Sequence, residues 1–336
     1  MRIKRLLSHS VSLVCIVIMT ANGLLAQQET PSFRWYKGNT HTHTLNSDGD
    51  SIPLEAAKWY RENGYNFVFI TDHEYITNVG PLNHILGKSG SFLVISGQEI
   101  TDSYDRKPLH LNGLGLEKVV MPNRLQGSVA TLQKNIDDIR AGGGVPQLNH
   151  PNFGWALTAD EIKQLKNVRL MEIHNGHPLV NNLGGGGSPS AEQIWDELLT
   201  GGMVIYAIAD DDVHHFKRIG DKTAATPGHG WVMVRAAELT PAAIMAALDN
   251  GDFYASTGVE LEEYTADGSG ISIKIKQQTW SKYRVQFIGS GGRVLGETFD
   301  NPATYKFNGN EGYVRAKIYE SNGKLAWTQP VFFKGP

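Results

Sequence analysis

Histidines and carboxylates recur in this sequence at positions where they could hold a divalent cation. His41 and His43 are two residues apart, directly after the short run 35–37, and Asp48 follows them. In a strand, residues i and i+2 face the same side, so we expect these two histidines to project together. Two imidazoles directed at one point are typical ligands of zinc and related metals. Paired histidines also occur on ordinary surfaces, so this pair alone leaves both interpretations open.

More residues of these types follow other apolar runs, at or just beyond their carboxyl ends. They are His73 after 67–70, Glu99 after 92–95, His110 within 109–114, His150 after 145–148, His174 after 169–173, and Asp212 and His214 after 203–209. Helices are expected between the runs, over 53–63, 128–141, 191–200 and 241–250. This alternation indicates about seven or eight parallel βαβ units, which favours a closed barrel over an open sheet. The carboxyl ends of barrel strands surround one mouth, where these side chains would meet.

The pattern changes near residue 260. Residues 271–276 alternate apolar and polar side chains, and further short strands are expected over 283–288, 303–307, 313–319 and 327–333, with glycine- and asparagine-rich turns between them. This predicts a small antiparallel β-sandwich over 260–336, after a barrel over 27–259.

The first 26 residues have the pattern of a secretory signal peptide. A basic start precedes an apolar core over 11–19, and Ala26 offers a small residue for cleavage. The core is short for a membrane span, so a membrane anchor is the less favoured alternative. We therefore expect a periplasmic or extracellular protein with no transmembrane segment in the mature chain. Cys15, the only cysteine, lies in this segment, which leaves no disulfide and no thiol nucleophile after cleavage.

The charge of the chain argues against one class of partner. Removing the three basic residues of the signal segment takes the formal net charge from −3 to −6. A mildly acidic protein with no basic run is a poor candidate for binding duplex nucleic acid. Its 40% apolar and 19% charged residues are typical of a globular protein. The oligomeric state stays open.

The ordered set of motifs resembles a known family. It consists of His41-Thr42-His43 with Ser47-Asp48-Gly49, Thr71-Asp72-His73, Gly97-Gln98-Glu99, residues 110–115, Asn149-His150-Pro151, residues 172–175, and Asp212-Val213-His214. In this order, over about residues 38 to 258, it is similar to the motifs of the PHP (polymerase and histidinol phosphatase) superfamily, and most similar to a branch grouped with carbaryl hydrolase.

The resemblance implies a distorted (β/α)7 TIM-like barrel that holds two or three divalent metals, either zinc, manganese or iron. The implied ligands are His41, His43 and Asp212 for the first metal, Glu99 as a bridge, His110 and His150 for the second, and Asp48, His73 and His214 for the third. Asp212 is preferred over Asp210 and Asp211 only because of its Asp-x-His spacing.

Physical chemistry agrees with a metal cluster. So many imidazoles and carboxylates cannot be packed together without cations, because their desolvation would be too costly. A water bridging two metals would lose a proton near neutral pH and become the nucleophile, so no protein nucleophile is needed.

Several residues are candidates for roles around the metals. Glu99 and Asp212 are predicted to be catalytic, with His215 as a proton donor to the leaving group. Substrate contacts are predicted for His174, Asn175, Arg218 and His229. For His215, Arg218 and His229, a polar residue on the rim is the plainer alternative. We expect His84 and His177 to be ordinary surface residues.

We therefore expect a secreted metal-dependent phosphoesterase acting on a phosphomonoester or a small phosphodiester. An ester, carbamate or amide hydrolase with the same metals is the first alternative. The second is a non-catalytic glycan-binding surface protein. The glycine-rich segment 184–187 could be a substrate lid or a plain linker.

Overall fold

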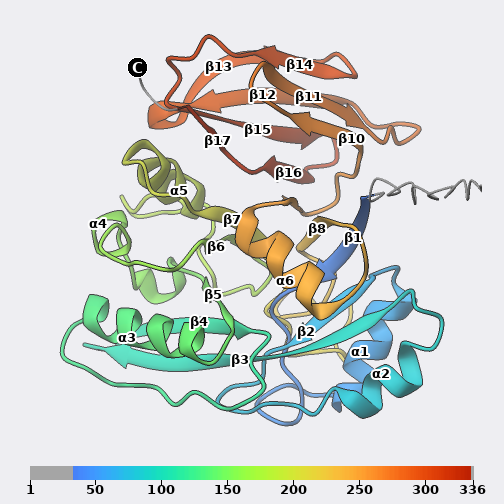
Figure 1. Cartoon of the computed structure of the whole chain (residues 1–336), viewed down its shortest axis with the longest axis vertical. Coiled ribbons are helices and arrows are strands. Elements are labelled where there is room, and N and C mark those ends of the chain that lie inside the picture. Colours follow the sequence, from blue (N-terminus) through green and yellow to red (C-terminus); the bar gives the residue numbers. More distant parts are fainter. Residues whose placement is uncertain (1–32, 334–336) are drawn as a thin grey trace, which may run out of the picture. The chain divides into compact units, whose positions relative to one another are not determined.

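The computed structural model describes residues 33–333, which form a mixed α/β fold with one sheet of 14 strands and one of three (Figure 1). The expected signal peptide, residues 1–26, lies outside the described residues. Within the described part, no helix combines the length and the apolar character that a membrane crossing requires.

Seven neighbouring strands of the large sheet, in chain order, carry the predicted site. They are β1 (Arg34–Asn39), β2 (Phe67–Ile70), β3 (Leu93–Tyr104), β4 (Lys107–Leu114), β5 (Val145–Leu148), β6 (Leu170–Asn175) and β7 (Tyr206–Asp210). Six of them share one direction, and β4 pairs antiparallel with β3 and β5. The expectation of parallel units throughout is therefore wrong at β4. A two-residue turn, Asp105-Arg106, with φ of 49° and 63°, makes a β3–β4 hairpin in place of a parallel βαβ connection.

The expected closed barrel is not formed, because among the described strands no ladder of hydrogen bonds joins β7 back to β1. The described strands end the sheet at β7, and the segments after β1 and β7 meet through a single bridge, Thr42–Val213. β1 instead pairs antiparallel with β8 (Trp231–Ala236), which continues to β9 (Phe253–Ser256).

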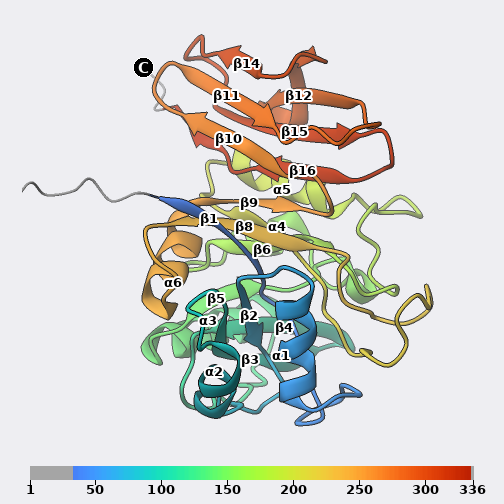
Figure 2. The same cartoon turned by 90° about the vertical axis from the view of Figure 1, so that its right-hand side faces the viewer.

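Helices cover the outside of these strands (Figures 1 and 2). They are α1 (Pro53–Glu62), α2 (Gly80–Leu86), α3 (Ser128–Ala141), α4 (Ala159–Ile162), α5 (Ala191–Thr200) and α6 (Pro241–Asn250). The apolar run of β2 is buried on both faces, as predicted: Phe67 and Phe69 pack in a core with α6, whereas Val68 and Ile70 pack beneath α1 and α2. Alternation along one strand thus joins two cores.

The C-terminal strands form two layers over a shared core. The large sheet continues from β9 through β16 (Leu325–Thr328), β15 (Tyr313–Glu320), β12 (Tyr283–Gly289) and β13 (Arg293–Thr298), with β17 (Val331–Phe332) on β15, and the small sheet is β10 (Leu261–Ala266), β11 (Gly270–Ile275) and β14 (Ala303–Lys306). Ile273 and Phe287 contribute to the core. Because β16 pairs with β9, no break in the sheet marks the expected boundary at residue 260, which stays a prediction.

Polar contacts of Arg315 and of Gln329 help to join the C-terminal strands to the rest. The fully buried Arg315 of β15 pairs with Asp196 at 2.7 Å and Glu192 at 2.8 Å, both on α5. The Gln329 side-chain amide accepts a hydrogen bond from the Ala207 N–H at 2.8 Å and donates one to the Ala207 carbonyl at 2.9 Å. This amide occupies the edge of β7 where a further strand would pair.

Candidate metal centre

Strand register brings the predicted ligands to one end of the sheet. The parallel pairing Ile70↔Ser96 continues as a bridge between His73 and Glu99. In the reversed strand β4, His110 lies opposite Thr101 of β3, so the amino-terminal half of β4 reaches the same end as the carboxyl halves of its neighbours. His150 follows β5 by two residues, at the same edge. The reversal of β4 therefore preserves the convergence that the sequence predicted.

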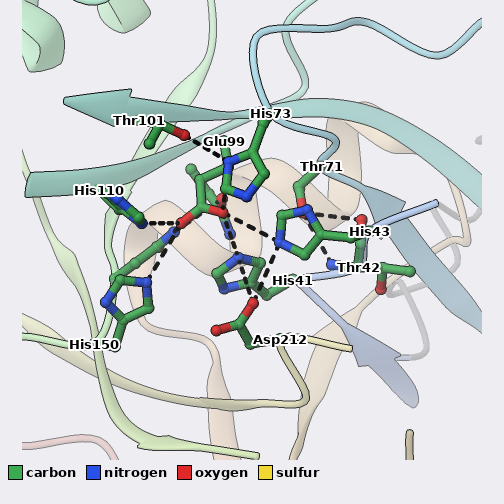
Figure 3. Close-up of polar contacts among 12 residues, drawn as sticks. His41, Thr42, His43, Thr71, His73, Glu99, Thr101, His110, His150 and Asp212 are labelled. Atoms are coloured by element: carbon green, nitrogen blue, oxygen red, sulfur yellow. Dashed lines mark hydrogen bonds and ion pairs between the residues drawn. The ribbon is translucent and has the colours of Figure 1, made fainter. Parts of the chain in front are cut away.

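The Glu99 carboxylate lies at the centre of the cluster, 1% exposed (Figure 3). Its Oε2 is 3.1 Å from Nε2 of both His41 and His43, and 3.3 Å from Nδ1 of His73. Its Oε1 is 3.1 Å from Nδ1 of His110 and 3.4 Å from Nε2 of His150. The two oxygens thus face two different sets of imidazoles, which is the arrangement expected of a carboxylate that bridges two cations.

Candidate ligand atoms fall into groups whose members all lie within 4.8 Å of one another. Three of the groups are His41, His43, Glu99 and Asp212; Glu99, His110 and His150; and His43, Asp48, His73 and His214. All nine predicted ligands are present in these groups. Their metal binding itself stays a prediction.

The choice among three consecutive aspartates is decided by their contacts. Oδ1 of Asp212 lies 3.2 Å from Nε2 of both His41 and His43. Asp211 instead accepts hydrogen bonds from the Tyr60 hydroxyl and two backbone amides, and Asp210 accepts from side chains deeper in the sheet. Asp212 also has a left-handed φ of 46°, which is strained for a residue with a side chain and common at functional sites.

The donor set fits divalent metals. The Nε2 atoms of His41 and His43 are buried and have no hydrogen-bond partner among the described residues, although both face carboxylate oxygens. Burial lowers the pKa of His41, but Asp212, Glu99 and Glu172 outweigh it and raise that pKa well above its usual value. Burial raises the pKa of Glu99, but the histidines around it hold that pKa well below its usual range. The buried carboxylates thus require positive charge, which protons on the imidazoles or bound cations can supply.

Glu172 of β6 is a site residue that the sequence analysis did not single out. Its Oε1 is 2.7 Å from Nδ1 of His41, which leaves Nε2 of that ring for a metal. Its Oε2 accepts the His150 N–H at 2.6 Å and the Asn175 amide at 2.8 Å. A carboxylate behind a ligating histidine fixes the tautomer and orientation of the ring. The motif 172–175 contained the signal, because Glu172 is a charged residue within an apolar strand.

Asp72 is a second supporting residue, with no exposed surface. Its carboxylate accepts hydrogen bonds from the Thr44 amide and from the hydroxyls of Thr44, Ser47 and Thr77. These contacts fix the loop that presents Asp48. The acidic residue directly before His73 in the sequence therefore orders the loop, and does not lie in the ligand groups.

A cavity of about 260 Å³ opens beside the cluster. Its lining consists of Asp48, His73, Glu99, His110, His150, Asp212 and His214, together with Phe153, His177, Leu179 and Val180. The expectation that His177 is an ordinary surface residue is therefore wrong. Its Nδ1 accepts the Leu179 N–H at 3.2 Å, which places the proton of the neutral ring on Nε2. The residue lies in a loop without periodic pattern, so the sequence offered little signal.

Two residues predicted to contact substrate, His174 and Asn175, do not line the cavity. Glu172 and His174 should share a face of β6, but a register shift between them turns His174 to the other side, where its ring stacks on Trp327 with centroids 6.2 Å apart. Burial lowers the pKa of His174 to about 4. Asn175 is 2% exposed and donates hydrogen bonds to Glu172 and to Asp212. It positions these carboxylates and does not line the cavity.

Three further predicted residues are also absent from the cavity lining. His215, predicted to be catalytic, points to Asp50 with Nδ1 and Oδ2 3.5 Å apart. Arg218 forms an exposed ion pair with Asp221. Nε2 of His229 lies 3.0 Å from the Thr226 hydroxyl. The plainer alternative of a polar rim residue describes these side chains better.

Comparisons with known proteins agree with the fold. No family model matches the chain. A 5′-3′ exoribonuclease from Haemophilus influenzae is 26% identical over 181 residues, which is 51% of this chain and 65% of that protein. The match thus spans slightly less than two thirds of the relative.

Two solved structures were also similar. A two-domain protein containing a predicted PHP-like metal-dependent phosphoesterase, from Bacteroides vulgatus, has a TM-score of 0.51 at 16% identity and covers 89% of this chain and 96% of its own. An amidohydrolase from Chromobacterium violaceum, solved with sulfate, has a TM-score of 0.40 at 14% identity and covers 54% of this chain and 88% of its own. The Bacteroides vulgatus structure alone carries the conclusion: it confirms, at the level of the fold, the resemblance first suggested by the motifs.

Proposed function

We propose that the chain is a metal-dependent hydrolase, and specifically a phosphoesterase acting on a phosphomonoester or a small phosphodiester. The observation that carries the proposal is the Glu99 carboxylate, whose two oxygens face His41 and His43 on one side and His110 and His150 on the other. An isolated structural metal would not need ligands divided in this way. Two or three cations, either zinc, manganese or iron, suit the mixed imidazole and carboxylate donors.

The residues of the chain have separate roles in this proposal. When bound, the metals would polarise a phosphoryl oxygen and acidify a water molecule. Glu99 and Asp212 hold negative charge between the histidines, and Glu172 orients His41. His177, with its proton fixed on Nε2, is placed to donate a hydrogen bond to substrate at the cavity wall. In this role it replaces His215, which lies outside the lining.

We also propose a more detailed description of the fold and a cellular location for the protein. The seven strands β1–β7 correspond to a distorted (β/α)7 TIM-like barrel whose last ladder is missing, and the two C-terminal layers correspond to an appended β-sandwich. The proposed signal peptide over residues 1–26 would export the protein to the periplasm or beyond.

A carboxylic ester, carbamate or amide is the second candidate substrate class. It is favoured by the cavity lining, which contains no lysine or arginine among the described residues that could pair with a phosphate. The name of the Haemophilus influenzae relative adds the end of an RNA chain as a candidate phosphoester.

Metal analysis and a substrate panel test the proposal. Purified protein offered zinc or manganese should retain more than one equivalent of metal, and should hydrolyse nitrophenyl phosphate or bis-nitrophenyl phosphate faster than nitrophenyl acetate. Dominant turnover of the acetate would replace the phosphoesterase by the second candidate. Protein that stays metal-free would remove the proposal altogether.

A matched pair of variants separates the centre from general effects. Glu99→Gln should lower both metal content and turnover, because it removes the charge that faces five imidazoles. Glu117→Gln, at an exposed position outside the ligand groups, should change neither. Unchanged hydrolysis in Glu99→Gln would instead favour a binding protein with structural metals.

A further inference from the structure

The cavity beside the metal centre has one apolar wall. Phe153, Leu179 and Val180 line it beside the ligand groups, and no lysine or arginine is among the described lining residues. Arg218, the predicted phosphate contact, is engaged by Asp221 in an ion pair of 2.5 Å outside the lining. The cavity therefore offers charge only at the metal cluster itself.

Packing and hydrogen bonds with neighbouring residues hold these apolar side chains in place. The ring of Phe153 packs edge-on against His150, with centroids 5.2 Å apart. Asn182 holds the loop that carries Leu179 and Val180. Its side chain accepts a hydrogen bond from the Asn175 N–H at 3.0 Å and donates one to the Asn175 carbonyl at 2.8 Å.

A second set of hydrogen bonds, made by Asn152, also holds this loop. The Asn152 side chain donates hydrogen bonds of 3.0 Å to the carbonyls of Asn181 and Pro189. These bonds hold the loop at Asn181, Asn182 and Pro189, and yet Leu179 remains 66% exposed at the mouth. A large apolar side chain kept at the mouth by such contacts is suited to cover an apolar group of a ligand.

We propose that the site selects substrates whose organic group is apolar and uncharged, such as an aromatic ring, and that Phe153, Leu179 and Val180 bind that group. This inference rests on the proposed phosphoesterase function, and it names the class of ester. Nucleotides with several phosphates and oligonucleotides would bring additional negative charges, which need cationic partners in the site.

Binding of non-hydrolysable phosphonates to the zinc-loaded protein, measured by calorimetry, tests this selectivity without turnover. Phenylphosphonate should bind about tenfold more tightly than methylphosphonate, from burial of part of the ring. 4-Carboxyphenylphosphonate, which adds a distant anion to the same ring, should bind more weakly than phenylphosphonate.

Two variants connect the effect to the wall. Leu179→Asn should reduce the phenyl-to-methyl affinity ratio at least threefold, whereas Leu183→Asn should leave it unchanged, because Leu183 is 89% exposed in the same loop but outside the lining. Both positions are exposed, so neither substitution should alter the melting temperature.

Several outcomes would overturn the inference. They are equal affinity for the phenyl and methyl compounds, an unchanged ratio in Leu179→Asn, and tighter binding of a 5′-phosphorylated oligoribonucleotide than of phenylphosphonate at physiological salt. A preference for phenylphosphonate that depends on Leu179, in a protein that hydrolyses no phosphoester, would uphold the apolar wall and refute the proposed reaction. Phosphoester hydrolysis without any preference would do the reverse.

Discussion

The position of His174 leads to a prediction about stability and pH. Its Nε2 is buried without a hydrogen-bond partner among the described residues, and its ring stacks on Trp327 of β16. Burial lowers the pKa of His174 from 6.5 to about 4, although a hydrogen bond with the His229 backbone works in the opposite direction. The unfolded chain therefore binds a proton between these pH values that the folded chain does not. Stability from this group is present above pH 6.5 and is lost as the pH falls toward 4.

The size of the effect follows from the same values. Each pH unit below 6.5 removes about 1.4 kcal/mol from the free energy of unfolding, so moving from pH 7.5 to pH 5 removes about 2 kcal/mol. The residue retains some exposure to solvent, which reduces the expected loss to between about 1 and 2 kcal/mol. His174→Phe keeps a ring against Trp327 but cannot accept the proton. The stability of the natural chain relative to this variant should therefore fall by that amount.

Urea unfolding at pH 7.5 and pH 5, in excess chelator, measures the difference. Chelation keeps metal release at low pH from contributing, and the comparison with the variant cancels the titration of all other groups. His84→Phe, at an exposed position of α2, is the control and should follow the natural chain at both pH values. A difference between the natural chain and His174→Phe that is the same at pH 5 and pH 7.5 would refute the reasoning.

Three more predictions concern the metal centre and the C-terminal strands. Glu172→Gln should weaken zinc binding roughly 10- to 100-fold in competition with a chelating dye, because it loosens His41, whereas the exposed Glu197→Gln should not. Zinc at 100 times its dissociation constant should raise the free energy of unfolding by about 2.7 kcal/mol, and an unchanged urea midpoint would contradict binding to the folded state. Arg315→Met should cost about 3–5 kcal/mol by leaving the Asp196 carboxylate without its cation, and a loss no larger than that of the half-buried Arg284→Met would show that the buried ion pairs matter little.

Periodicity and motif order predicted most of the elements and the convergence of ligands. The run 67–70 is a strand buried on both faces, and the helix expected over 128–141 is α3. The predicted ligands on the parallel strands converge because these strands present their carboxyl ends at one edge, which His110 reaches from the reversed strand β4. Asp212 could be chosen by its spacing to His214, and its contacts with His41 and His43 agree.

The structure differs from the predictions where a local irregularity of the backbone sets the position of a side chain or a strand. A one-residue shift in β6 reverses the direction of His174, and nothing in its composition reveals that shift. The turn at Asp105-Arg106, where both residues adopt left-handed φ values, makes a hairpin that reverses β4 relative to β3. His177 reaches the cavity through a loop whose path depends on side-chain contacts far apart in the sequence, such as that of Asn152 with Pro189.

The Gln329 side-chain amide at the edge of β7 affects the tendency of the chain to associate with other copies. An unprotected strand edge is a template on which a second molecule can add, and proteins that leave one free tend to associate. Here a single side chain from the last part of the chain satisfies both backbone groups of Ala207. Until Gln329 is synthesised and reaches Ala207, this edge of β7 has no such cover. A nascent or truncated chain that lacks Gln329 is therefore more open to self-association at this edge.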